Sequence, residues 1–266
     1  MLGLALAACA APVFNLQARF SPREVREYRL VADANVRITA GRASTSELSR
    51  LVATTRIEVV DISGATTTLT LTLSPTSLTR DGKAAPVPAQ QQIRLVVASD
   101  GRVTQVTGGG DQNAPLEAAD IEDLVPLIGP PLPPGRVHLG DRWSRSTSTP
   151  GPSPSGTPSP IPTASTGTQE ARLEALRVVE GYDCAVVAIS TQRPVVRDRT
   201  VGGQPLRLEG VEFAASEIAF AFRLGVPVTV RSDSEARLAI SGGGAQGGSV
   251  VIATKTALTL VRRTIR

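Results

Sequence analysis

Few side chains in this sequence could do nucleophilic or acid–base chemistry. It contains two cysteines, Cys9 and Cys184, and a single histidine, His138. A catalytic cysteine needs a base nearby, usually a histidine, and nothing in the local sequence pairs His138 with either cysteine. His138 alternates with Val137 and Leu139, which indicates a side chain on the polar face of a strand. The pattern therefore does not predict a cysteine nucleophile.

Motifs of common catalytic centres are also missing from the sequence. There is no Gly-x-Ser-x-Gly elbow, His-Glu-x-x-His, phosphate-binding loop or Cys/His zinc spacing. Residues 242–247 fit Gly-x-Gly-x-x-Gly, but strand-like segments flank them, so they predict a turn rather than a dinucleotide site. Glu122 and Asp123 suit the start of a helix, whereas a carboxylate pair from distant strands stays open. We expect no enzyme, no metal site and no cofactor.

The residues before Cys9 suggest a different chemistry for its thiol. Residues 2–8 form a short apolar run that ends in small side chains, as a secretory signal requires, although the usual basic region is missing. The order Leu6-Ala7-Ala8-Cys9 resembles a bacterial lipobox, in which the cysteine is lipidated and becomes the new N-terminus. This resemblance implies lipidation of Cys9, export, and anchorage to the membrane of a bacterial cell envelope. The alternative is a frayed N-terminus with an incidental cysteine.

The second cysteine lies in an apolar, strand-like run. Cys184 belongs to "YDCAVVAIS", which favours a small buried core residue. If the chain is exported without lipidation, a disulfide between Cys9 and Cys184 is the alternative.

Composition narrows the class of protein further. The chain has 266 residues, of which 41% are apolar but only 3% aromatic, so its core must be aliphatic. The net charge is +4, and the arginines alternate with acids rather than forming a basic tract. No apolar segment approaches the ~20 residues that span a bilayer. We expect a monomer that binds no nucleic acid.

Most of the chain alternates with the period of a β-strand. Leu69, Leu71 and Leu73 alternate with threonines, and a turn at residues 63–65 completes a hairpin over residues 48–73. Asp100-Gly101 marks the turn of a second hairpin.

The C-terminal third predicts long strands joined by tight turns. Ile218 and Phe220 share one face, whereas Val211 and Phe213 have the other parity, which suggests a β-bulge or a bend near Ala214-Ala215. Long strands at this spacing suggest a sandwich or barrel.

Two segments interrupt the strand pattern. Residues 115–129, "PLEAADIEDLVPLIG", have apolar side chains near helical spacing and acids at the start. We expect a short amphipathic helix that is either ordinary core or a lid over a cavity. Its candidate ligand-facing residues are Ile121, Leu124, Val125 and Ile128. Residues 147–167 are rich in Pro, Ser and Thr and predict a disordered inserted loop.

A family resemblance appears in residues 130–144, "PPLPPGRVHLGDRWS". Gly140, Asp141 and Trp143 match a Gly-Asp-x-Trp strand element that recurs in uncharacterised bacterial lipoproteins. Those proteins look similar in architecture to the lipoprotein-carrier and mycobacterial lipid-carrier families, whose curved half-barrels hold helices on the concave side. The resemblance implies binding of lipids or other hydrophobic molecules. From the residues alone, Gly-Asp marks a turn and Trp143 is a large core residue beyond it.

These patterns together predict a mainly β protein: a curved antiparallel sheet, as a half-barrel or open barrel, with one short helix near the middle of the chain. We expect a signal segment at residues 1–9, a tether at 10–22 and one β-rich domain at 23–266. The function expected is a cell-envelope lipoprotein that binds a hydrophobic or lipid-like ligand. The alternative is a structural or interaction lipoprotein with a solid core and no ligand cavity.

Overall fold

The computed structural model describes residues 12–108, 130–149, 165–201, 204–242 and 247–265. Within these ranges the chain forms strands and turns, and no helix. The strands are β1 (Phe14–Asn15), β2 (Glu24–Ala40), β3 (Ala43–Ser63), β4 (Thr66–Arg80), β5 (Lys83–Ala85), β6 (Gln91–Ala98), β7 (Val103–Gly108), β8 (Arg136–Val137), β9 (Arg142–Thr149), β10 (Ser165–Val179), β11 (Tyr182–Val201), β12 (Gln204–Ala221), β13 (Val226–Gly242) and β14 (Gly248–Ile265).

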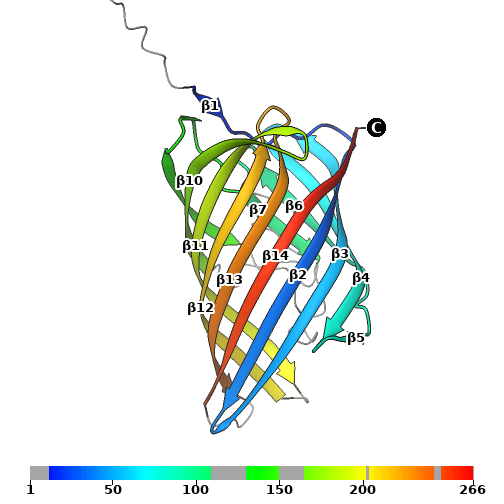
Figure 1. The fold of residues 1–266 in the computed structure, drawn as a ribbon, viewed down its shortest axis with the longest axis vertical. Helices are drawn as coiled ribbons and strands as arrows, with labels where there is room; N and C mark the ends of the chain where they lie inside the picture. The colour runs from blue at the N-terminus through cyan, green and yellow to red at the C-terminus, as the bar shows by residue number, and fades with distance from the viewer. Residues whose placement is uncertain (1–11, 109–129, 150–164, 202–203, 243–246, 266) are drawn as a thin grey trace, which may run out of the picture.

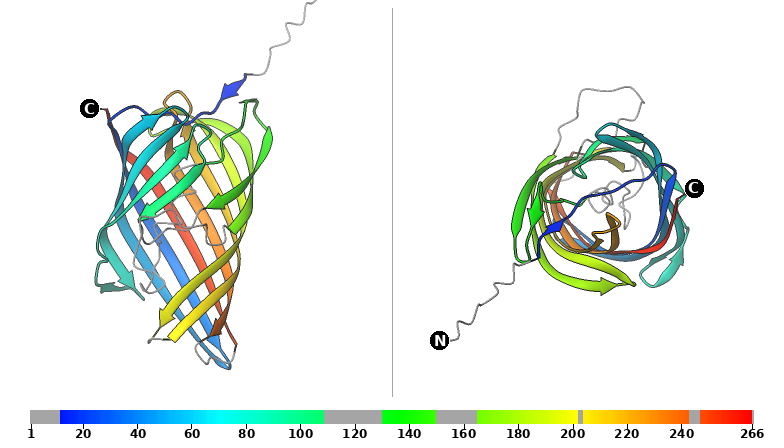
Figure 2. Two further views of the ribbon diagram at one scale, coloured as in Figure 1. Left: turned by 180° about the vertical axis from the view of Figure 1, so that it is seen from behind. Right: turned by 90° about the horizontal axis from the view of Figure 1, so that it is seen from above.

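One large antiparallel sheet of 12 strands makes up almost all of this structure. Its order is β7-β6-β4-β3-β2-β14-β13-β12-β11-β10-β9, with β5 paired to β4, while β1 and β8 form a separate pair. The sheet curves round on itself but is not closed, because β7 and β9 are its two edges and do not pair (Figure 1, Figure 2). The prediction of a mainly β protein with a large curved antiparallel sheet is therefore confirmed.

The curved sheet tapers from a wide end to a narrow end (Figure 1). The wide end, uppermost in Figure 1, carries β1, the C-terminus and the turns at residues 64–65, 180–181 and 222–225. The narrow end carries the turn at residues 41–42 between β2 and β3. We use these two names below.

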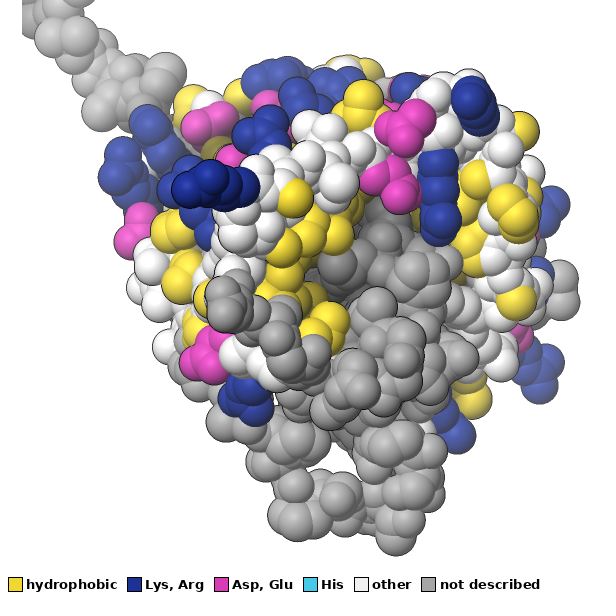
Figure 3. All heavy atoms as spheres, turned by 90° about the horizontal axis from the view of Figure 1, so that it is seen from below, with side chains coloured by type: hydrophobic (Ala, Val, Ile, Leu, Met, Phe, Trp, Pro, Cys, Tyr) yellow, Lys and Arg dark blue, Asp and Glu magenta, His cyan; other side chains and the backbone are white. Residues whose placement is uncertain are grey.

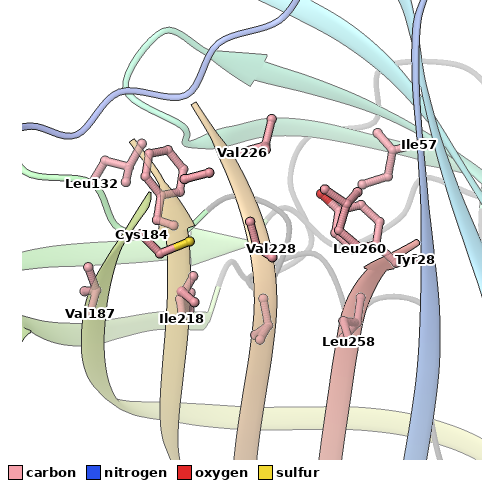
Figure 4. Packing of buried hydrophobic residues seen from close by; sticks show 14 of the residues in the cluster. Tyr28, Ile57, Leu132, Cys184, Val187, Ile218, Val226, Val228, Leu258 and Leu260 are labelled. Atoms are coloured by element: carbon pink, nitrogen blue, oxygen red, sulfur yellow. The ribbon is translucent and has the colours of Figure 1, made fainter. Parts of the chain in front are cut away.

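The main core lies on the inner face of the sheet near the wide end. Leu69, Leu71 and Leu73 are all buried there, which confirms the alternation seen in the sequence. Leu16 and Leu132 come from segments outside the large sheet and pack into the same cluster. Figure 4 shows Leu132 among side chains that point from several strands into this common space. The wide half is therefore filled mainly with aliphatic side chains, together with the buried aromatic residues Tyr28 and Phe220.

The expected β-bulge near Ala214-Ala215 is wrong. Strand β12 pairs with both neighbours without interruption through these residues, and its irregularity lies at Ala219/Phe220 instead. Phe213 has the opposite parity to Ile218 because it lies on the outer face, where it is 49% exposed. An exposed aromatic residue on a regular strand therefore mimicked a phase switch.

Two expected segments lie wholly or partly beyond these ranges. The expected helix at 115–129 lies wholly outside the described residues. In the expected loop at 147–167, β9 and β10 pair as far as Thr149 and Ser165, and only residues 150–164 lie outside the description. Part of the expected tether, by contrast, packs against the wide end through Leu16.

Candidate functional site

The inner face of the sheet changes character along its strands. Beyond the main core, toward the narrow end, the cross-strand register brings polar side chains from the six neighbouring strands β9 to β14, and from β3 and β4, into rows across the sheet. We call this zone the polar belt. Its members are Glu47, Ser49, Arg80, Arg145, Gln169, Thr191, Arg193, Glu212, Ser216, Ser232, Ser234 and Thr254.

Ion pairs and hydroxyl hydrogen bonds satisfy part of the polar belt. Arg193 Nη2 lies 2.6 Å from Glu212 Oε2, and these two side chains are only 16% and 14% exposed. The Ser216 and Ser232 hydroxyls lie 2.9 Å apart and are hydrogen-bonded. A partly buried ion pair of this kind is held by the low dielectric of its surroundings and costs free energy to separate. The belt is therefore a fixed polar surface inside the curve of the sheet.

Two other belt residues have polar atoms without partners. Among the described residues, Arg145 Nε and Gln169 Oε1 are buried and make no hydrogen bond, and the two residues face each other across β9 and β10. Burial lowers the pKa of Arg145, although Asp100 nearby raises it. The guanidinium donates one hydrogen bond, from Nη1 to the Asp100 carbonyl at 3.3 Å. A donor and an acceptor are thus left available on the inner face at the β9 edge.

Beyond the belt, at the narrow end, the inner face is apolar again. We call this zone the narrow-end patch. Its four central side chains are only 1–7% exposed, and its members all come from five neighbouring strands of the one sheet. Figure 3 looks into this end and shows hydrophobic side chains on the inner wall. The members are Val195, Leu208, Leu238 and Val250 at the centre, with Val36, Ala236, Ile240 and Ile252 around them.

The patch differs from the main core in what packs against it. In the main core, Leu16 and Leu132 reach the inner face from outside the large sheet. In the narrow-end patch, no described residue from outside the sheet joins the cluster. A sheet face that is apolar needs a second layer to remove it from water. Among the described residues, the patch is therefore a buried aliphatic area whose members all belong to the sheet itself.

Two hollows of the sheet lie outside the narrow-end patch. A hollow of about 1280 Å³ and a smaller one of about 880 Å³ run across the middle of the strands. Their lining residues come from both faces of the strands: Ser49, Thr191, Ser234 and Thr254 of the polar belt line the larger hollow, together with exposed residues such as Arg50 and Lys255. Arg50 pairs with Asp33 at 3.4 Å, and Lys255 pairs with Asp233 at 3.7 Å. No residue of the narrow-end patch lines either hollow.

Of the residues that the sequence analysis considered, Cys184 and Trp143 belong to the packing of the main core, and His138 lies at the surface. Cys184 is a buried free thiol within the main core, and burial raises its pKa, so it is poorly suited to act as a nucleophile. His138 is half exposed, and its ring lies 3.4 Å from Asp141. Trp143 packs against the main core and donates a hydrogen bond from Nε1 to the Pro131 carbonyl at 2.8 Å. These placements agree with the core and strand-face interpretations of the sequence.

The Gly-Asp part of the motif forms a turn, as expected. Gly140 has a φ of +92°, which favours glycine, and its amide donates to the Leu173 carbonyl at 2.8 Å. The Asp141 carboxylate accepts a hydrogen bond from the His138 amide at 2.8 Å. The motif therefore joins β8 to β9 and fixes β9 beside β10.

The remaining sequence-derived candidates lie outside the described residues. These are the lipidation site Cys9 and the helix residues Ile121, Leu124, Val125 and Ile128. The register-dependent residues of the polar belt and the narrow-end patch were missed, because their proximity depends on which strands pair. Within the described ranges, no cluster of His, Cys, Asp and Glu could hold a metal ion, and no helix is available to cross a membrane.

Comparisons with known proteins show similarity of fold alone. No family model and no curated protein matches the chain. A lipovitellin structure concerned with lipid–protein interactions matches 92% of this chain at 13% identity and a TM-score of 0.49, and the chain spans 26% of its length. A structure from Vibrio parahaemolyticus, described as an outer membrane lipoprotein-sorting protein domain, matches 89% of this chain and 84% of its own length, at 11% identity and a TM-score of 0.16. A DUF1329 family protein from Desulfovibrio piger matches 88% and 84%, at 13% identity and a TM-score of 0.17.

Proposed function

We propose that this protein is an exported lipoprotein of a bacterial cell envelope that binds a hydrophobic or lipid-like ligand against the narrow-end patch. The observation that carries the proposal is the aliphatic inner face at the narrow end, whose cluster contains only residues of the sheet itself among those described. Its four central side chains are only 1–7% exposed and form a continuous aliphatic surface on the inner face of the sheet. An acyl chain or another aliphatic group supplies the contacts that such a face requires.

The polar belt supports an amphiphilic ligand. It borders the narrow-end patch on the same face, one row of residues away, so a tail on the patch places a head group beside the belt. Arg145 Nε and Gln169 Oε1, the unpartnered atoms among the described belt residues, offer one donor and one acceptor to such a head group. Within the belt, the pair Arg193–Glu212 lies beside the patch, because Glu212 pairs across β12 and β13 with Ala236.

Ligand binding is tested by mass spectrometry of the lipids extracted from the purified full-length protein. The test variant is Ile252→Asn in the narrow-end patch, and the matched control is Val251→Asn, its neighbour on the outer face of β14. Both side chains are half-buried, so the two substitutions disturb the strand to a similar extent. We expect Ile252→Asn to lower the amount of bound lipid several-fold and Val251→Asn to leave it unchanged.

Two results would contradict ligand binding. One is wild-type protein that carries no more lipid than an unrelated protein purified in the same way. The other is equal lipid content in Ile252→Asn and Val251→Asn. Anchorage is tested separately by incorporation of labelled palmitate, which we expect Cys9→Ser to abolish.

A second function is favoured by the filled wide half. In the main core, Leu16 and Leu132 pack onto the inner face from outside the large sheet, which suits a structural or interaction lipoprotein with a solid interior. Partners would then use the unpaired edges of β7 and β9, whose backbone groups can add a strand. Absence of lipid combined with partner capture that is lost on charge substitution in β7 or β9 would favour this function.

A further inference from the structure

Large apolar side chains are exposed around the wide end. Seven of them lie at or near the ends of the chain segments that meet there, and each is between 38% and 71% exposed. They come from the end of β3, the end of β10, the end of β14, the turn before β9 and the residue before β1. The seven residues are Val13, Val60, Ile62, Leu139, Val178, Val261 and Ile265.

The hairpin tip at the narrow end has a different composition. The turn between β2 and β3 reads "AGRASTSE" over residues 40–47, which holds only small and polar side chains. The turn at the other end of β3 is flanked instead by Val60 and Ile62. The same long strand therefore ends in a polar tip at one end of the molecule and in an apolar tip at the other.

The described chain also begins at the wide end. Strand β1 pairs with β8 and lies at this end (Figure 2). Cys9 precedes Val13 by four positions, and an extended chain spans at most about 3.6 Å per residue. An acyl chain on Cys9 would therefore hold the wide end within roughly 15 Å of a bilayer.

Arginines stand among the exposed apolar side chains. Arg19, Arg136 and Arg223 are exposed at the wide end, and guanidinium groups bind phosphate oxygens in a bidentate manner. Acids are present as well: Arg223 pairs with Asp183 at 3.6 Å, and Arg262 with Glu27 at 2.9 Å. This mixture of apolar and arginine side chains matches the chemistry of a bilayer interface, where apolar groups enter the acyl boundary and cations meet phosphates.

We propose that the wide end is a membrane-contact surface that rests on a phospholipid bilayer. Its apolar rim, in particular Val60, Val178 and Val261, enters the interface, and the narrow-end patch is then held at the far end of the molecule. The surface does not depend on a ligand, and it acts in addition to any anchor at Cys9.

The first test measures partitioning onto vesicles of phosphatidylethanolamine and phosphatidylglycerol. The full chain carries Cys9→Ser, so that no lipid anchor contributes. The test variant adds Val178→Asp and Val261→Asp. The matched control adds Leu48→Asp and Val196→Asp, which are also exposed, at 57% and 42%, but lie away from the wide end. We expect the test variant to partition on the order of tenfold more weakly than the control. Equal partitioning of the two variants would overturn the proposal.

A second test detects contact between the wide end and the bilayer directly, and it does not depend on which part of the chain contributes most to membrane binding. Single tryptophans replace Val178, Val261 or Val196, and vesicles contain brominated phosphatidylcholine, which quenches tryptophan in the acyl region. Trp143 contributes the same background in all three variants, because it packs against the main core. We expect additional quenching at positions 178 and 261 and none at 196. Quenching that is equal at all three positions, or absent from all of them, would overturn the proposal.

Discussion

At the scale of single residues, Glu24 is the most unusual side chain of the described structure. It is fully buried, and its carboxylate accepts hydrogen bonds from Arg26 at 2.8 Å, Arg263 at 2.6 Å and the Ser21 amide at 2.8 Å. Burial alone would raise the pKa of Glu24, but the two arginines outweigh it and hold the pKa below its usual 4.5. The ionised carboxylate therefore stabilises the fold.

The sign of this pKa shift gives a prediction. A folded-state pKa below the unfolded one stabilises the protein above about pH 4.5, and this contribution is lost as the pH falls below that value. Glu24→Gln leaves Arg26, which is 4% exposed, without its charged partner, and should lower the free energy of unfolding by about 3 kcal/mol at neutral pH. Urea unfolding between pH 3 and pH 7 checks this. Parallel pH profiles for wild type and variant would contradict it.

The sequence predicted the burial of individual side chains better than it predicted which side chains interact. The apolar run around Cys184 and the alternation around His138 were sufficient to predict a buried thiol and an exposed ring, because neighbouring residues determine strand parity. The pairing of Arg193 with Glu212 was not predictable, because it depends on the register of β11 against β12. Most of the polar belt could not be predicted from the sequence, because its residues come together only through strand register.

At the scale of elements, one glycine fits the N-terminal segment against the β12–β13 turn. Gly225 has a φ of +72°, its carbonyl accepts a hydrogen bond from the Arg19 amide at 3.1 Å, and an added Cβ would lie 2.5–2.6 Å from Arg19 atoms. Gly181 has a similar φ of +80° but meets nothing within 4 Å. The two turns therefore share a backbone conformation and differ in packing.

This pair of glycines separates backbone strain from a steric clash. Gly181→Ala should cost about 1 kcal/mol, the usual penalty of an L-residue in the left-handed region. Gly225→Ala should cost more, by about 1–2 kcal/mol, because the segment around Arg19 must move. Denaturant unfolding measures the difference, and hydrogen exchange at the Arg19 amide locates it. Equal losses of stability in the two variants would show that the N-terminal segment is not fixed by this contact.

The elements themselves were largely predictable, whereas their lengths and phases were less so. Threonine–leucine alternation in β4 specified a strand and its buried face. The turn at Asp100-Gly101 was predicted correctly, and Gly101 has a φ of +82°. Phe213 misled the interpretation of β12, since sequence alternation does not distinguish a core aromatic residue from one on an exposed outer face.

At the scale of the whole molecule, the first and last long strands are neighbours at the centre of the sheet. Strand β2 pairs with β14 along nearly its full length, so the two halves of the sequence share one continuous sheet. Leu258 lies at this junction, is 3% exposed and pairs with Leu30. Sequence patterns predicted one β-rich domain but not this strand order, because pairing between distant strands leaves no local signal.

Because the pairing of β2 with β14 joins the two halves of the sequence in one sheet, we expect the whole sheet to unfold cooperatively. Leu258→Ala should lower the free energy of unfolding by about 2–5 kcal/mol, because it opens a cavity in the main core. Val261→Ala in the same strand is the control and should change it by less than about 0.5 kcal/mol, since Val261 is 67% exposed. Trp143 on the distant edge strand β9 then gives a second probe beside circular dichroism. We expect both probes to move together to lower denaturant in Leu258→Ala. A Trp143 transition that stays at its wild-type midpoint would show that β9 unfolds independently of the central strands, and that the curved sheet comprises two cooperative units rather than one.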